Sequence, residues 1–391
     1  MAAGRIKWYS QRVPLRPRLI LRFLIFALIV VSLYGAVRLK RAELVDFVVP
    51  RTAAARFVAH ERLYRPEDGH YQYKYFPAFA LAMVPFTWMP KEVAEAIWFT
   101  LTVAMTAALL SLSRAALPDP RLAATTLVWL TLLLTGKFLV KELAFGQFNL
   151  PVALLLLGAA MAAQRGRAMA AGALVAAGVF VKPYALILVP WLAWRFGWRP
   201  FVTFGLVLAG GLALPAAFYG WNGNVTLMHE WYRTVTETTG PNLMGFENMS
   251  FASMWAKWLE PGPTAAALAL ASAVAAVAAG IVLMARWRRS PDPHYLDVAY
   301  FLVLVPLLSP QGWDYVLVIA LPAYMCLVDR WRDLPPAWRA VALTGFFFTS
   351  FTIFDLLRRP LYTRLMQLGA ISVGAVLIAI CLIRLRSLAL A

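Results

Sequence analysis

Long apolar runs, interrupted by short polar stretches, extend through almost the whole chain. A helix needs about 20 mostly apolar residues to cross a hydrocarbon core of about 30 Å, and many of these runs approach that length. The pattern therefore predicts an all-α protein that crosses a membrane repeatedly. The expected helices lie at 19–38, 75–89, 92–113, 122–136, 149–164, 168–181, 184–197, 200–219, 263–285, 295–308, 314–328, 337–356 and 365–384.

The segment 75–89 is expected not to span, because it contains Pro85 and ends at Pro90, and proline interrupts the hydrogen bonds of a helix. A re-entrant or interfacial position suits it better, which leaves about 12 spanning helices. The alternative is that 75–89 crosses the membrane and one of the short segments within 168–197 does not. Basic residues cluster between the other runs, as the positive-inside rule describes for cytoplasmic loops. These clusters fall at 165–167, 195–199, 286–289, 330–332 and in the C-terminal tail.

The basic N-terminal stretch 1–18 is similar to the start of a signal peptide, but no small-residue cleavage site follows the first apolar run. We therefore expect a retained first helix and a cytoplasmic N-terminus. Residues 40–74 then form a first external loop, and 220–262 form a long external loop. The whole chain, 1–391, is expected to be a single integral membrane domain that crosses the inner (plasma) membrane many times.

Composition supports a membrane class, because 61% of the residues are hydrophobic and 14% are charged, against about 25% charged in soluble domains. The net charge of +18 would suit a nucleic-acid partner, but the cations are divided among separate clusters, so no nucleic acid is expected. Cys326 and Cys381 lie in apolar runs and give no metal-ligand spacing. No glycine-rich phosphate loop is present. Neither a metal nor another cofactor is expected.

Asp46 and Glu43 follow the first predicted helix, where the chain enters its first external loop. A carboxylate in this place acts either as a general base or as the partner of a nearby cation such as Arg41 or Arg51. On position alone, the ion pair is the simpler interpretation. Pro50 is expected to end any helix that begins near Asp46.

Lysines near the ends of predicted helices form a second set of candidates. Lys137 falls at a helix end, where a charge in a membrane is costly unless it pairs or reaches the interface. It either pairs with Glu142 or, together with Lys141, holds a phosphate or carboxylate. Lys182 precedes Pro183, which breaks the helical hydrogen bonds, so this lysine either meets an anion there or extends to the membrane surface.

Two further polar segments contribute candidates. The loop 220–262 mixes aromatic, amide and carboxylate side chains, which suits sugar recognition, because a ring stacks on the apolar face of a sugar while polar groups bind its hydroxyls. Aromatic residues in such a segment also fit the interfacial belt of a membrane protein. Asp314 follows Trp313 between two predicted helices, where it either caps the second helix or belongs to a site. Capping is the more economical interpretation.

Several short motifs, taken in order, resemble those of glycosyltransferase family 87. They are Asp46, Leu63-Tyr64, Lys74-Tyr75-Phe76-Pro77, Gly146-Gln147-x-Asn149-Leu150, Val181-Lys182-Pro183 and Ser309-Pro310-x-x-Trp313. Each motif is loose alone, and it is their order that carries the resemblance. The resemblance implies a GT-C-like bundle of about 12 transmembrane helices with a catalytic first external loop.

The same resemblance implies an integral membrane glycosyltransferase that moves a mannose-like hexose from a polyprenyl-phosphate sugar to a lipid or glycan acceptor, with inversion, on the extracytoplasmic face. Asp46 takes the place of the general base. The candidate substrate-binding residues are Tyr64, Lys74, Tyr75, Lys137, Lys141, Glu142, Gln147, Asn149, Lys182, Asn248, Trp313 and Asp314. The lipid bilayer is a further partner.

Two other functions are compatible with the same chain. A transporter or flippase of a lipid-linked sugar would need charges along a path through the bundle, whereas the charges here gather on one predicted face. A purely structural subunit would leave Lys137 and Lys182 without an explanation.

Overall fold

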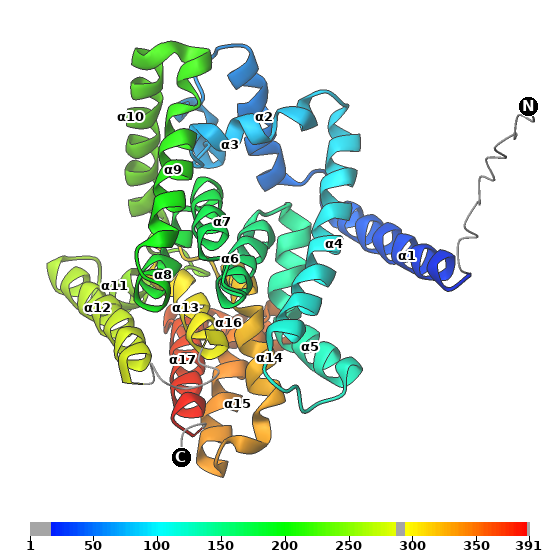
Figure 1. Ribbon diagram of the computed structural model, residues 1–391, viewed down its shortest axis with the longest axis vertical. Helices are drawn as coiled ribbons and strands as arrows, with labels where there is room; N and C mark the ends of the chain where they lie inside the picture. The colour runs from blue at the N-terminus through cyan, green and yellow to red at the C-terminus, as the bar shows by residue number, and fades with distance from the viewer. Residues whose placement is uncertain (1–16, 287–293, 389–391) are drawn as a thin grey trace, which may run out of the picture. The chain divides into compact units, whose positions relative to one another are not determined.

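A computed structural model of the chain describes residues 17–286 and 294–388, which are almost entirely helical (Figure 1). The chain divides into two compact units, 1–42 and 43–391. The only β pairing among the described residues is an isolated antiparallel bridge between Asn248 and Trp313. The expectation of an all-α protein is therefore confirmed.

The described part of the first unit is α1 (Pro17–Lys40), which covers the expected helix 19–38. The basic N-terminal stretch lies almost wholly outside the described residues, and so does most of the basic cluster 286–289.

The second unit contains the remaining helices, joined by short turns. Its α-helices are α2 (Val45–Val58), α3 (Pro77–Ala82), α4 (Lys91–Ala116), α5 (Ala124–Phe145), α6 (Asn149–Gln164), α7 (Ala168–Val181), α8 (Val189–Phe196), α9 (Arg199–Ala213), α10 (Ala216–Asn242), α11 (Phe251–Leu259), α12 (Pro263–Arg286), α13 (His294–Leu308), α14 (Leu321–Asp329), α15 (Pro336–Ser350), α16 (Phe354–Gln367) and α17 (Ala370–Leu388). Its 3-10 helices are η1 (Pro66–Tyr71), η2 (Val84–Thr87), η3 (Pro183–Leu188), η4 (Asp314–Ala320) and η5 (Trp331–Asp333).

Within the described residues, α4, α12 and α17 are each long and apolar enough to cross a membrane. The bent pairs α9–α10 and α15–α16 add one span each if each pair is a single broken span, so the total is three to five. The chain is therefore a multi-pass membrane protein. By this measure the described residues do not reach the expected total of about 12 spans.

Short apolar helices account for part of the difference. α6, α7 and α13 have 16, 14 and 15 residues. At 1.5 Å per residue they are about 21–24 Å long, which is less than the hydrocarbon thickness of about 30 Å. The apolar run 184–197 is divided between η3 and α8, and a proline stands at the start of each. The segment 75–89 forms only α3 and η2, which agrees with the expectation that it does not span.

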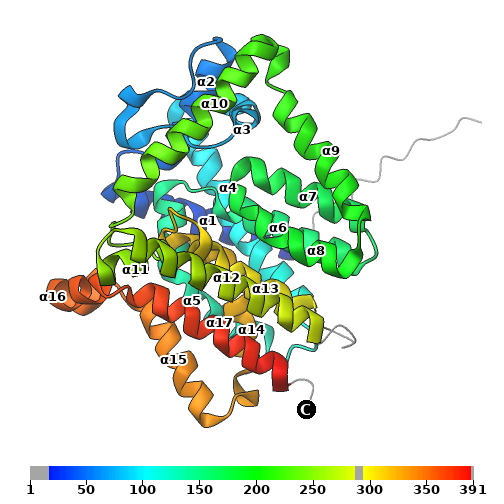
Figure 2. The ribbon, with the colours of Figure 1, turned by 90° about the vertical axis from the view of Figure 1, so that its left-hand side faces the viewer.

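α7 packs against α9, and a glycine permits the contact (Figures 1 and 2). A Cβ atom on Gly172 of α7 would lie 1.9 Å from the carbonyl oxygen of Pro200 in α9. The hydroxyl of Thr203 donates a hydrogen bond to the carbonyl oxygen of Met169 at 2.6 Å across the same contact. Small residues allow apolar helices to approach closely. The packing fixes the position of α7, which leads directly into Lys182.

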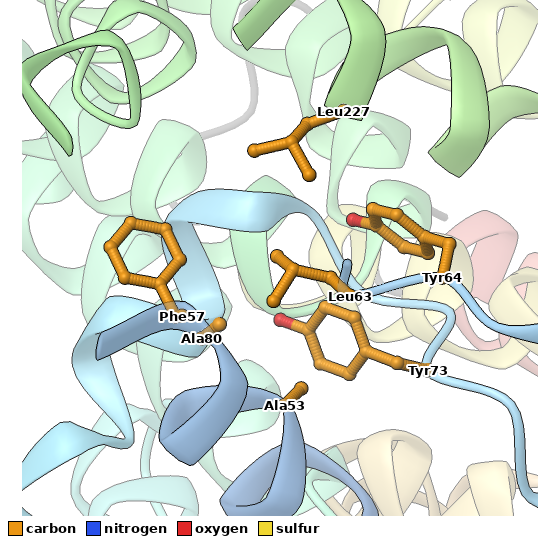
Figure 3. Close-up of a cluster of buried hydrophobic side chains, with 7 residues drawn as sticks. All are labelled: Ala53, Phe57, Leu63, Tyr64, Tyr73, Ala80 and Leu227. Carbon is orange, nitrogen blue, oxygen red and sulfur yellow. The ribbon is translucent and has the colours of Figure 1, made fainter. Parts of the chain in front are cut away.

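The expected first external loop, 40–74, is largely helical, because α2 and η1 lie within it. Pro50 lies inside α2 and does not end it, which corrects the expectation. Its missing N–H removes only the hydrogen bond to the carbonyl of Asp46 one turn earlier, and the helix continues to Val58. Buried side chains pack against this segment in an apolar cluster that consists of Ala53, Phe57, Leu63, Tyr64, Tyr73, Ala80 and Leu227 (Figure 3).

The expected long external loop, 220–262, is also mostly helical, because it contains most of α10 and the whole of α11. α10 is bent by 89° from α9, and an ion pair between Arg233 and Glu237, one turn apart at 2.6 Å, lies on its exposed surface. Hydropathy alone does not distinguish a polar helix from a polar loop.

Candidate active site

Asp46 lies in the first turn of α2, and the packing of α2 fixes its position. The nearby residues Leu44 and Phe47 are fully buried. Phe47 stacks on Trp98 with 5.6 Å between the ring centroids, and Trp98 donates from Nε1 to the carbonyl oxygen of Gly146 at 3.2 Å. The backbone around Asp46 is thus anchored, while its own side chain is only partly buried.

Gly146 brings the end of α5 against the start of α2. It ends α5 in the left-handed conformation, with a φ of 71°. A Cβ atom on Gly146 would lie 2.8 Å from the Cβ of Phe47 and 2.9 Å from the Cβ of Leu44. Only glycine satisfies both the backbone conformation and this close approach. The next residue, Gln147, is thereby placed beside Asp46.

The amide of Gln147 joins a carboxylate to a cation. Its Nε2 donates to Oδ2 of Asp46 at 2.5 Å, and its Oε1 accepts from Nζ of Lys182 at 3.3 Å. Oδ1 of Asp46 accepts no hydrogen bond from any residue within 17–286 and 294–388. Asp46 and Lys182 are therefore held close together without a direct ion pair.

The simpler interpretation of Asp46, an ion pair with a nearby cation such as Arg41 or Arg51, is wrong, because Gln147 is the residue within 17–286 and 294–388 that bonds to its carboxylate. Arg51 donates to two backbone carbonyl oxygens at 3.0 and 2.9 Å. Glu43 pairs with Lys91, the first residue of α4. The carboxylate of Asp46 is thus left available for chemistry rather than used for a surface ion pair.

Buried polar groups hold Lys182 from its other side. Glu142 is fully buried and accepts hydrogen bonds from the backbone N–H groups of Asn149 and Leu150 at 2.7 and 2.9 Å, which satisfies the start of α6. Nδ2 of Asn149 donates to Glu142 at 2.8 Å. Oδ1 of Asn149 accepts from Nζ of Lys182 at 2.8 Å and from the hydroxyl of Tyr184 at 2.5 Å. Lys182 thus lies between two amide oxygens, which argues against its extension to a membrane surface.

Burial and charge act in opposite directions on the titrating groups of this site. Burial raises the pKa of the Asp46 carboxyl group above its usual range, and the positive charge of Lys182 is the largest opposing effect. Burial lowers the pKa of Lys182 to about 8, against the attraction of nearby carboxylates. Burial also lowers the pKa of Lys74, against the charge of Asp46. Nζ of Lys74 bonds to none of the described residues, so this cation is available to an anion.

A second group of charged residues adjoins the first. Asp314 is fully buried and pairs with Nζ of Lys137 and of Lys141, each at 2.9 Å. Lys141 also pairs with Glu247 at 2.6 Å, and Glu247 accepts a hydrogen bond from the hydroxyl of Tyr362 at 3.2 Å. Two lysines and two carboxylates are thus balanced, so each lysine already has an acidic partner.

This second group corrects two local interpretations. Lys137 pairs with Asp314 and not with Glu142, whose oxygens bond to the start of α6. Asp314 does not cap a helix, because no side-chain cap bond is present at the start of η4 and its carboxylate accepts from Lys141. The long-range partners prevail because a buried charge without a partner costs several kcal/mol.

The remaining candidates have partners within the fold. Asn248 is buried, donates from Nδ2 to two carbonyl oxygens at 3.0 and 3.1 Å, and pairs through its backbone with Trp313. Tyr64 lies in the apolar cluster of Figure 3 and donates to the carbonyl oxygen of Tyr75 at 2.7 Å. The ring of Tyr75 packs 5.6 Å from that of Phe148. Roles for these residues in substrate binding stay predictions.

The structure thus sorts most candidates into two adjoining groups. The first contains Asp46, Lys74, Glu142, Gln147, Asn149 and Lys182, and the second contains Lys137, Lys141 and Asp314. Tyr315 lies near both groups, because it interacts electrostatically with both Asp46 and Asp314. No three His, Cys, Asp or Glu side chains converge as metal ligands in the part of the chain that the structure describes.

Sequence reasoning did not assign several residues that contact these groups, namely Tyr184, Glu247, Tyr315 and Tyr362. Glu247 had a detectable signal, because it stands beside Asn248 in a polar segment. The tyrosines had none, because tyrosine is common wherever a membrane protein meets the interface.

Comparison with known proteins gives one result. A model of glycosyltransferase family 87 matches residues 73–310, more than half of the chain. No curated protein and no solved structure gives a significant match. The matched stretch contains Lys74, Gln147 and Lys182 and begins after Asp46, so the assignment of Asp46 depends on the geometry around it.

Proposed function

The chain belongs to glycosyltransferase family 87, and on this premise we propose that it transfers a mannose-like hexose from a polyprenyl-phosphate sugar to a lipid or glycan acceptor. Asp46 acts as the general base, while Lys74 and Lys182 bind the phosphate of the donor. The observation that carries this proposal is the amide of Gln147, which bonds to Asp46 at 2.5 Å and to Lys182 at 3.3 Å. The side-chain amide of Gln147 thereby holds the base on one side and the cation on the other.

The base is suited to accept a proton from a hydroxyl group. Oδ2 of Asp46 accepts the hydrogen bond from Gln147, and Oδ1 is left to accept the proton of the acceptor hydroxyl. Because burial raises the pKa of Asp46, its carboxylate is a stronger base than an exposed one. General-base catalysis of this kind contributes about 10²–10⁴-fold to a rate.

The leaving group requires positive charge. As the acceptor oxygen bonds to the anomeric carbon, the bond from that carbon to the phosphate oxygen breaks, and its electron pair leaves with the polyprenyl phosphate. Lys182 and Lys74 are the cations near Asp46 that have no direct acidic partner at ion-pair distance among the described residues. Fixed cations stabilise such charge without reorganisation. Lys137 and Lys141 are less suited to this role because Asp314 already pairs with both.

A single base predicts a single displacement. The chain places one carboxylate, Asp46, beside the cations, with the other buried carboxylate of this group, Glu142, committed to the start of α6. With no second free carboxylate among the described residues of this group, attack opposite the leaving group inverts the anomeric centre, by analogy with inverting glycoside hydrolysis. Family membership also favours transfer over transport of a lipid-linked sugar.

The proposed orientation places the N-terminus in the cytoplasm and the site on the extracytoplasmic face of the inner (plasma) membrane. Cysteines at the exposed positions Glu67 and Glu237 are expected to react with an impermeant thiol reagent in intact cells, and a cysteine at the exposed position Gln164 is not. These positions avoid Gly69 and Gly166, whose positive φ values disfavour any other residue. The native cysteines are buried. Labelling at Gln164 in intact cells, without labelling at the other two, would reverse the orientation.

Replacement of Gln147 by leucine tests its role in positioning. The change removes both hydrogen bonds of the amide, so we expect kcat to fall about 10- to 10²-fold with a smaller change in KM, because the base moves relative to the hydroxyl. Gln164→Leu, at the exposed end of α6, is the matched control and is expected to transfer normally. A Gln147→Leu enzyme with unchanged kcat would show that Asp46 does not need this amide.

A further inference from the structure

α16 lies at a steep angle to the helix before it and is itself kinked at Arg358, where φ is 58°. It turns by 98° from α15, and Figure 2 shows it at the edge of the second unit, beyond α11 and α15. α15 is a largely apolar helix of 15 residues that forms a candidate span only together with α16. If α15 enters the membrane, a helix at nearly a right angle to it runs along the membrane surface.

Several large apolar side chains of α16 are exposed. Phe354, Leu356 and Leu361 are 50%, 59% and 47% exposed, and Leu368 at the end of the helix is 54% exposed. Nε1 of Trp258, itself an exposed ring, donates to the carbonyl oxygen of Leu368 at 3.0 Å. Tryptophan is enriched at the boundary between headgroups and acyl chains. These exposed apolar side chains therefore suit an apolar medium with a polar boundary.

The same helix carries cations without partners. Arg358, Arg359 and Arg364 are exposed, and their guanidinium groups form no ion pair or hydrogen bond with any residue that the structure describes. Asp355 is the only acidic residue in α16, so the helix has an excess of two positive charges. Arginine binds phosphate groups well, and arginines together with exposed large apolar side chains are common in helices that lie on anionic membranes.

We propose that α16 is an interfacial helix that binds the headgroups of anionic phospholipids in the surrounding bilayer. The arginines contact the phosphates, while Phe354 and the leucines lie among the upper acyl chains. Tyr362 of the same helix donates to Glu247, which pairs with Lys141. The bound headgroups are thus on the same side of the molecule as the second charged group. The inference does not depend on the reaction that the protein catalyses.

Photocrosslinking tests this surface directly. The purified full-length protein is placed in bilayers of phosphatidylcholine that contain a trace of photoreactive phosphatidylglycerol, and the labelled peptides are identified by mass spectrometry. We expect label on residues 354–368. The variant with Arg358→Gln, Arg359→Gln and Arg364→Gln should take up at least about fivefold less label there, because each cation near an anionic surface contributes substantially to binding. Replacement of the same three residues by lysine should retain most of the label.

A matched triple variant controls for the loss of charge. Arg165, Arg167 and Arg199 are also exposed, so their replacement by glutamine removes the same charge elsewhere and should leave the label on α16 unchanged. Melting temperatures of all variants confirm that each one is folded. Equal labelling of 354–368 by photoreactive phosphatidylcholine, or no loss of label in the first glutamine variant, would contradict the proposal. So would the absence of label together with a dimer whose interface covers α16.

Discussion

Replacement of Asp46 by asparagine is expected to lower the rate of sugar transfer by about 10²-fold or more, because the amide cannot accept a proton at neutral pH. Asparagine has nearly the same shape, and its oxygen can still accept the hydrogen bond that Gln147 donates to Oδ2. Donor affinity and the melting temperature should therefore change little. Turnover and melting are measured on the same purified preparation, so that loss of activity and loss of folding are distinguished.

Two variants control this experiment. Asp46→Glu should recover only part of the rate, because one added methylene group displaces the carboxylate from the acceptor hydroxyl. Asp119→Asn removes an exposed carboxylate with a φ of 40°, a conformation that asparagine tolerates, and should transfer at the wild-type rate. An Asp46→Asn enzyme that stays folded and also transfers at the wild-type rate would exclude Asp46 as the base.

Replacement of Lys182 by alanine is expected to weaken donor binding and to lower kcat/KM by about 10²-fold, because one of the fixed cations that stabilise the leaving phosphate is lost. Folding should be less affected, since Oδ1 of Asn149 still accepts a hydrogen bond from Tyr184. Lys91→Ala, which removes a lysine from a partly exposed ion pair, is the control. Unchanged donor affinity in Lys182→Ala would limit this lysine to a structural role.

The pH dependence of kcat/KM separates the two roles further. Asp46 must be ionised to act as a base, so activity is expected to fall as the pH drops through its pKa, which burial raises above the usual range. Lys182 must be protonated to hold a phosphate, so activity in the free enzyme is expected to fall as the pH rises through about 8. Lys182→Arg should move this upper limit to higher pH, because arginine stays charged.

Hydropathy predicts the long apolar helices well, because their length alone distinguishes them. The expected segments 92–113, 263–285 and 365–384 correspond to α4, α12 and α17, with boundaries that differ by a few residues. It does not determine the number of spans, since an apolar run says nothing about where the backbone turns. The 89° bend between α9 and α10 and the 98° bend between α15 and α16 have no counterpart in the hydropathy pattern.

The candidate site, like the fold, could be predicted from the sequence only in part. Asp46, Gln147 and Lys182 could be singled out by residue type and motif order. Gln147 is 101 residues from Asp46 and 35 residues from Lys182 in the sequence, and no spacing rule predicts that they meet. Local rules also gave the wrong partners for Lys137 and Asp314. Those rules compare a residue with its neighbours in the chain, whereas a buried charge is paired by whichever opposite charge the fold brings near, here across 177 residues of sequence.

The proposed reaction is tested most directly by giving the purified protein a panel of radiolabelled polyprenyl-phosphate hexoses together with a membrane lipid extract as acceptor. We expect label from at least one donor, most readily a mannose-like sugar, to pass to an acceptor with inversion of the anomeric centre. The Asp46→Asn protein should form about 10²-fold less product or none. The proposed reaction would be contradicted if no polyprenyl-phosphate sugar gave a product and a nucleotide sugar served as the donor instead.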